Sequence, residues 1–213
     1  MKTKIFQLVL VSFIFIACLN QEIVLPTQTA ILPTPKTYPT ALPETWIGDA
    51  GLVSGKPCFA PCFFGIFAGQ TSINQAFDFL EANGDLFCVF DNETDIVCDN
   101  IIVTANPSTS LVESLGFSLD KMISVESIIS VYGEPNYIKI QRTSIPEAPK
   151  SFSILMFDEV KMVIWLPEIS GEQYPILHST SPELIMYFDD TNYVITKDLY
   201  APSPWNGYGI YEP

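Results

Sequence analysis

The sequence predicts an α+β domain, in which two degenerate αβ units build a mostly antiparallel sheet with two helices packed on one face. Two segments carry an apolar stripe at helical spacing between capping residues. Three pairs of apolar, strand-like runs are joined by short acidic turns. A proline-rich stretch over residues 18–45 separates this pattern from an apolar N-terminus, so residues 46–213 are expected to form a single domain.

The first helix is predicted over residues 71–84. Ser72 can cap the free amides at its start, and Gln75 follows three residues later, as in a capping box. Gly84 is a natural stop. The residues that share one helical face are Ile73, Ala76, Phe77 and Leu80.

The second helix is predicted over residues 124–133, with Ser124 as its cap, Gly133 as its end and Pro135 preventing continuation. Its apolar face consists of Val125, Ile128, Ile129 and Tyr132. Because strand-like segments follow each helix, we interpret the domain as two degenerate αβ units, too few and too divergent for a solenoid.

The strands are predicted mainly as hairpins in which a Phe ends the first strand and an Asp opens the turn. The predicted pairs are 86–90 with 96–104, 152–157 with 160–166, and 184–188 with 193–197. Further strands are expected over 137–142 and 111–117.

The N-terminus has the pattern of a secretory signal peptide over residues 1–17. Lys2 and Lys4 precede an apolar run over residues 5–17. As a helix this run would span only about 20 Å, short of a bilayer core of about 30 Å.

The run ends in Phe15-Ile16-Ala17-Cys18, which resembles a bacterial lipobox, with Phe15 in place of the usual Leu. The resemblance implies that Cys18 is lipidated and becomes the mature N-terminus. The alternative is an ordinary signal peptide in which Cys18 has no role. Residues 18–45 are rich in Pro and Thr and predict an extended, lipid-anchored tether that reaches at most about 75 Å, rather than an arm packed on the domain.

The charge balance narrows the class of partner. The chain has 24 Asp and Glu against 10 Lys and Arg, giving a net charge of -14. Removal of residues 1–17 would remove two lysines, so 8 basic residues would remain against 24 acidic ones, a net charge of -16. Such acidity excludes nucleic acid as a partner, and the 48% apolar content excludes a disordered acidic polymer.

Four further cysteines, an even number in an exported domain, favour disulfide bonds. The four are Cys58, Cys62, Cys88 and Cys98. We favour pairs 58–62 and 88–98, since the second pair flanks an acidic turn symmetrically, while crosswise pairing stays open. A zinc site fits poorly because the second pair is too widely spaced, and no Cys-x-x-Cys redox motif is present.

One segment is more distinctive than the rest. Its residues are Cys58, Pro61, Cys62, Phe63, Phe64, Gly65, Ile66, Gly69 and Thr71, and a later Tyr132-Gly-Glu-Pro-Asn136 ends the second helix. This block resembles uncharacterised bacterial exported lipoproteins with a Cys-x-x-Pro-Cys-aromatic-aromatic-Gly-Ile-x-x-Gly-x-Thr pattern. More remotely, the layout is similar to SmpA/OmlA assembly lipoproteins and β-lactamase inhibitor protein. The resemblance implies an exported lipoprotein and no particular activity.

No catalytic set, cofactor site or metal site is predicted. His178 is the only histidine and fits a loop better than a base. A calcium site would need the acidic turns, Asp189 and Asp190 among them, to cluster. A possible ligand-binding set is Trp205, Tyr208 and Tyr211, in a tail whose Pro and Gly residues argue against regular structure. The same tail could instead fold back as a plug.

These features predict a non-catalytic lipoprotein of the cell envelope, anchored to the outer face of the membrane. It would bind an unknown envelope protein or an extracellular ligand. The alternatives are an extracellular hydrolase that uses carboxylates and a protein inhibitor.

Overall fold

A computed structural model describes residues 49–82, 87–119, 123–142, 150–171 and 173–212. The chain divides into the units Met1–Thr37 and Tyr38–Pro213, and every described residue belongs to the second. The predicted signal peptide, Cys18 and the whole tether over residues 18–45 lie outside the described residues. Within the described part, no helix is long and apolar enough to cross a membrane.

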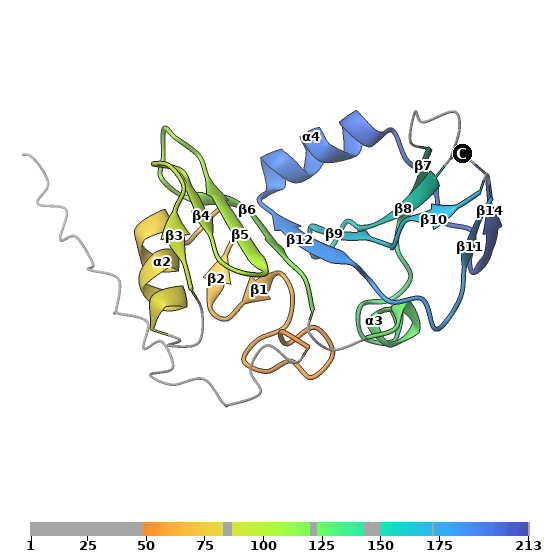
Figure 1. The fold of residues 1–213 in the computed structure, drawn as a ribbon, viewed down its shortest axis with the longest axis horizontal. Helices are drawn as coiled ribbons and strands as arrows, with labels where there is room; N and C mark the ends of the chain where they lie inside the picture. The colour runs from red at the N-terminus through yellow and green to blue at the C-terminus, as the bar shows by residue number, and fades with distance from the viewer. Residues whose placement is uncertain (1–48, 83–86, 120–122, 143–149, 172, 213) are drawn as a thin grey trace, which may run out of the picture. The chain divides into compact units, whose positions relative to one another are not determined.

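The protein is α+β, as predicted, with a ten-stranded antiparallel sheet in the order β13-β7-β8-β9-β12-β6-β5-β4-β3, where β10 also pairs with β8 (Figure 1). Its strands are β3 (Val89–Phe90), β4 (Asp95–Val97), β5 (Ile101–Ala105), β6 (Val112–Phe117), β7 (Tyr137–Arg142), β8 (Lys150–Phe157), β9 (Met162–Trp165), β10 (Ile169–Ser170), β12 (Leu184–Phe188) and β13 (Ser203–Pro204). Two small sheets pair β1 (Cys62–Phe63) with β2 (Ile66–Phe67), and β11 (Tyr174–Ile176) with β14 (Gly209–Tyr211).

Both predicted helices are confirmed, together with their serine N-caps, while Gly84, the predicted end of the first helix, lies outside the described residues. Helix α2 (Ile73–Glu81) begins after Ser72, which forms the expected capping box with Gln75. Helix α3 (Val125–Tyr132) begins after Ser124 and ends at Gly133. The caps form because the first amides of a helix have no partner within the helix, and a serine oxygen supplies one.

A third helix, α4 (Asp190–Tyr200), overturns one prediction. Residues 193–197 were expected to form the second strand of a hairpin, but they lie inside α4. The Asp189 side chain accepts a hydrogen bond from the Asn192 backbone amide, so the acidic pair caps a helix instead of turning a hairpin. Strand β12 therefore has β9 and β6 as its neighbours.

Two other predictions need correction. The expected strand over 96–104 is divided into β4 and β5, because the Cys98 amide donates to the Ile101 carbonyl and closes a tight turn. The C-terminal tail also contains regular structure, since β13 pairs with β7 and β14 with β11. The hairpin of β8 and β9 and the strands β6 and β7 are confirmed.

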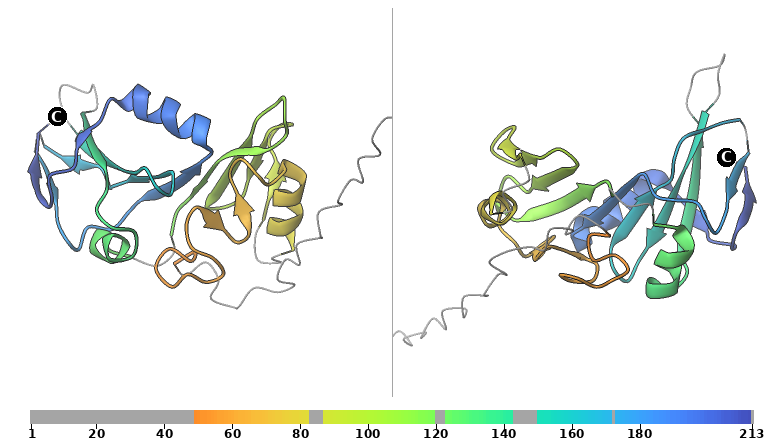
Figure 2. Two further views of the ribbon diagram at one scale, coloured as in Figure 1. Left: turned by 180° about the vertical axis from the view of Figure 1, so that it is seen from behind. Right: turned by 60° about the horizontal axis from the view of Figure 1, so that its bottom comes forward.

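The large sheet separates two apolar clusters, because side chains along a strand alternate between its faces. In β8, Leu155 and Phe157 join the larger cluster, whereas Ile154 and Met156 join the smaller one. Helices α2 and α3 contribute buried residues to the larger cluster, so the predicted pair of helices shares one face. Helix α4 lies over part of the other face (Figures 1 and 2), and its Tyr193 is buried in the smaller cluster.

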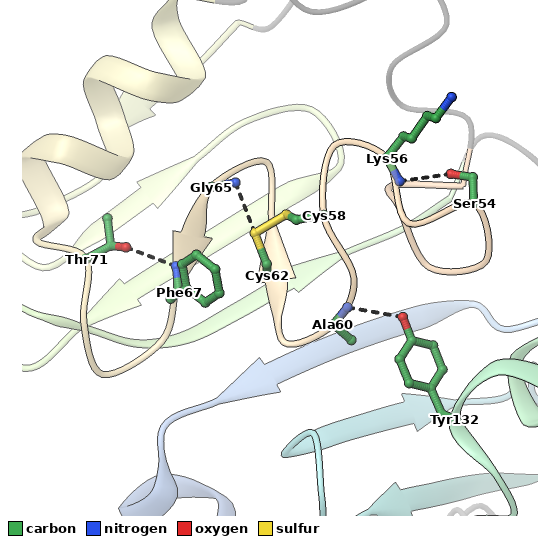
Figure 3. The surroundings of a disulfide bond; sticks show 9 residues. All are labelled: Ser54, Lys56, Cys58, Ala60, Cys62, Gly65, Phe67, Thr71 and Tyr132. Atoms are coloured by element: carbon green, nitrogen blue, oxygen red, sulfur yellow. Dashed lines mark hydrogen bonds between the residues drawn. A yellow bond between two sulfur atoms is a disulfide. The ribbon is translucent and has the colours of Figure 1, made fainter. Parts of the chain in front are cut away.

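The segment before α2 is a structural loop closed by a disulfide between Cys58 and Cys62 (Figure 3). The Ala60 amide donates to the Tyr132 hydroxyl at 3.1 Å, which joins the loop to α3. The Thr71 hydroxyl accepts from the Phe67 amide at 2.9 Å. The distinctive sequence block therefore includes residues that connect the loop to the helices around it.

The second disulfide joins Cys88 and Cys98. Val89 pairs with Val97 in the β3–β4 ladder, so the two cysteines occupy the next opposite positions, as the sequence predicted. Both favoured pairings are thus present, and these four cysteines are not zinc ligands in this structure.

Candidate functional site

A pocket of about 430 Å³ lies on the same sheet face as α4. Strands β8, β9 and β12, together with the segments that flank them, provide most of its wall. The lining residues are Ser118, Phe152, Trp165, Leu166, Glu168, Glu183 and Leu184. We call this hollow the Trp165 pocket.

Strand register explains why these residues meet. Trp165 is paired with Ile154 on one side and with Leu184 on the other, and residues paired across strands share a face. Phe152 lies two residues before Ile154 in β8, so it shares that face as well. Three neighbouring strands thus supply the apolar floor.

Helix α4 leaves this part of the face open. Its inward-facing Tyr193 is buried in the smaller cluster, and its last residue, Tyr200, meets Trp165 edge-on with ring centroids 6.3 Å apart. Phe152, Trp165 and Leu184 are half-buried, whereas Val163 under the helix is buried. The Trp165 pocket therefore begins where the cover provided by α4 ends.

The pocket rim is acidic. Glu168 and Glu183 are both exposed, and Glu168 forms a 2.8 Å ion pair with Lys150. Beside them, burial and the charge of Glu183 raise the pKa of Tyr174 to about 12. The Tyr174 hydroxyl donates to the Pro167 carbonyl, which ties β11 to the segment between β9 and Glu168. Among the described lining residues, the polar side-chain groups are the Ser118 hydroxyl, the Trp165 indole N–H and two carboxylates.

The predicted ligand-binding residues of the tail lie elsewhere. Trp205, Tyr208 and Tyr211 are half-buried and pack against the larger cluster, on the opposite face from the Trp165 pocket. Trp205 stacks with Tyr211 at a centroid distance of 5.8 Å, and Tyr208 stacks with His178 at 3.7 Å. The structure thus brings the three predicted residues together, in the manner expected of a tail folded onto the domain. Their binding role stays a prediction.

His178 lies in a turn, as expected for a loop histidine. Its Nδ1 is 3.3 Å from Glu126 Oε1, and both side chains are largely exposed. Together with the Tyr208 stack, this contact connects the tail to the start of α3.

Two of the three predicted acidic turns, at Asp158 and at Asp189, are engaged with helix α4 or with lysines. Asp189 caps α4, Asp158 contacts Lys197 at 3.3 Å, and Asp190 lies 3.8 Å from Lys161. Within the described ranges, no group of three or more His, Cys, Asp or Glu residues could hold a metal ion. The calcium alternative therefore gains no support from these turns.

The sequence did not point to the Trp165 pocket, because its residues come from segments joined only by sheet pairing. One signal was present. At the end of β8, Ile154 and Met156 alternate with Leu155 and Phe157 of the other face, which indicates a strand covered on both sides.

Searches against family models, curated proteins and solved structures found no match to this chain. The resemblance to exported lipoproteins therefore stays a prediction drawn from the residues of the Cys58–Thr71 block.

Proposed function

We propose that this protein is a lipid-anchored, non-catalytic binding module of the cell envelope that presents the Trp165 pocket to an extracytoplasmic ligand. The pocket carries the proposal. It combines an apolar floor with a few polar groups at its rim, and its volume of about 430 Å³ suits a small molecule.

The location is supported by the two disulfides, because such bonds persist in oxidising compartments outside the cytosol. The basic and apolar start of the sequence and Cys18 add the expected export signal and anchor. The acidic surface keeps the domain soluble and disfavours adhesion to anionic lipid headgroups.

The anchor is tested by mass spectrometry of the mature N-terminus, compared with that of Cys18→Ser. We expect a diacylated Cys18 in the native chain and release of the variant from the membrane fraction. An unmodified Cys18, or cleavage at another position, would reject the anchored form.

Binding is tested by the Trp165→Ala substitution in the full chain. We expect Trp165→Ala to abolish binding of any ligand recovered with the protein, while Trp205→Ala on the opposite face leaves it unchanged. If Trp205→Ala alone loses ligand binding, the binding site lies in the tail instead.

A carboxylate hydrolase is the second candidate, since Glu168 and Glu183 line one pocket. A general acid must be held protonated by apolar surroundings, whereas both of these carboxyl groups are exposed and Glu168 is paired with Lys150. This arrangement favours binding over catalysis. Glycoside hydrolysis that is lost in both Glu168→Gln and Glu183→Gln would establish the enzyme instead.

A further inference from the structure

We infer that the Trp165 pocket binds a small organic cation, an ammonium group carried on a compact apolar frame. The inference rests on the proposed binding function and names its ligand class. It depends on three properties of the pocket: the aromatic floor, the carboxylate rim and the balance of charge around them.

The floor suits an alkylated ammonium group. Trp165 and Phe152 are half-buried, so part of each side chain stays accessible beside the leucines of the lining. The face of a tryptophan ring attracts a cation more strongly than that of any other side chain, and methyl groups on the cation add apolar contact. Tyr200 meets Trp165 edge-on, a contact that stabilises the indole beside the pocket.

The rim supplies the counter-charge. Among the described residues, Glu183 has no ion-pair partner, so its charge is available to a ligand. Glu168 Oε2 contacts Lys150 at 2.8 Å, and this pair is close to neutral as a unit. The rim therefore carries an excess of one negative charge next to the aromatic floor.

Two lysines lie near the pocket, and neither reverses this balance. Lys150 is held by Glu168. Lys139, in β7, is paired with Ile154 of β8, so it lies on the same face as Trp165. The two residues are two strands apart, which separates their backbones by about 10 Å. The net charge of -14 adds a long-range attraction for cations and disfavours an anionic ligand.

A neutral sugar fits the pocket less well. Sugars need several directional hydrogen bonds, and the described lining side chains offer only the Ser118 hydroxyl and the Trp165 indole N–H besides the two carboxylates. An ammonium group instead gains from the carboxylates and from the ring at once. The ligand class is therefore set by charge more than by hydroxyl pattern.

The test compares choline with 3,3-dimethylbutan-1-ol, which has the same shape without the charge. Binding to the full chain is measured by titration calorimetry in a polyoxyethylene detergent, which carries neither charge nor sugar. We expect choline to bind at least about five-fold more tightly than the alcohol, and more weakly as salt rises.

The variants separate the two contributions. Glu183→Gln should weaken choline binding about three-fold and leave the alcohol unchanged, because it removes only the charge. Trp165→Phe should weaken choline, and Trp165→Ala should abolish binding of both probes. Glu159→Gln, in the turn between β8 and β9 at the opposite strand ends, is the matched control and should change nothing. Denaturant unfolding of each variant confirms that it is folded.

Equal binding of choline and the alcohol would overturn the inference and leave the binding function in place. Trp165-dependent binding of N-acetylglucosamine without any binding of choline would do the same. If none of the three probes binds in a Trp165-dependent way, the inference is overturned and the pocket loses its role in the proposed function.

Discussion

Removing the Cys88–Cys98 disulfide by the double substitution Cys88→Ala and Cys98→Ala should cost more stability than removing Cys58–Cys62. A disulfide limits the freedom of the unfolded chain, and the limit grows with the length of the loop it closes. The sequence separations are 10 for Cys88–Cys98 and 4 for Cys58–Cys62.

The chain-entropy relation gives about 2.7 kcal/mol for a separation of 10 and about 1.9 kcal/mol for a separation of 4. The two pairs are well matched in burial, because Cys98 and Cys62 are 4% and 2% exposed, so the loss of a buried sulfur is similar in both. The Cys88–Cys98 bond also secures β3, an edge strand whose only sheet partner is β4 among the described residues. We therefore expect a difference of about 1 kcal/mol or more.

The assay is guanidinium unfolding of the full chain, with Cys58→Ala/Cys62→Ala as the control. Hydrogen exchange supplies a local readout, since the Asp91 amide, which donates to the Asp95 carbonyl across the β3–β4 hairpin, should exchange faster only in the first variant. A cost for Cys88–Cys98 below that for Cys58–Cys62, or unchanged exchange in the hairpin, would refute the reasoning.

Three further predictions concern single residues. Ser72→Ala should lower the free energy of unfolding by about 1 kcal/mol, because α2 loses its capping box; an unchanged urea midpoint would contradict this. Gly51→Ala should cost about 2–4 kcal/mol and Gly207→Ala about 1 kcal/mol, as both have positive φ. Of these two glycines, only Gly51 would bring the new Cβ against backbone, namely the Cys58 carbonyl oxygen. Equal unfolding midpoints for the two variants would therefore contradict the clash. Tyr174 has its pKa raised from 10.0 to about 12, so the unfolded state loses this proton first and stability falls as pH rises from 10 to 12. Tyr174→Phe should show a shallower loss in alkaline denaturant titrations, and an identical slope would count against burial as the cause.

The features that the sequence predicted correctly are those with local causes. Ser72 and Ser124 cap helices because their oxygens reach amides within the next turn. The Cys88–Cys98 pairing follows from symmetry about one turn. Such signals survive in a single sequence because both partners lie a few residues apart.

Helix α4 was missed because its composition favours a strand. It contains Val194 and Ile195, which are common in sheets and are more than half exposed here. The deciding contacts are distant in sequence: Tyr193 is buried against β8 and β9, and Tyr200 meets Trp165. The Trp165 pocket was missed for the same reason, since its floor depends on the pairing of β8, β9 and β12.

The pairing of the tail sets the order in which this domain can be completed. A chain emerges from synthesis or export with its N-terminal part first. Among the described residues, β7 obtains its second neighbour from β13, and β11 obtains its partner from β14. Until residues 203–211 have arrived, one edge of the large sheet stays open to pairing with other chains. When they arrive, β13 covers β7 at Tyr137 and Ile138 and β11 gains its partner, so the tail is the last segment to pair.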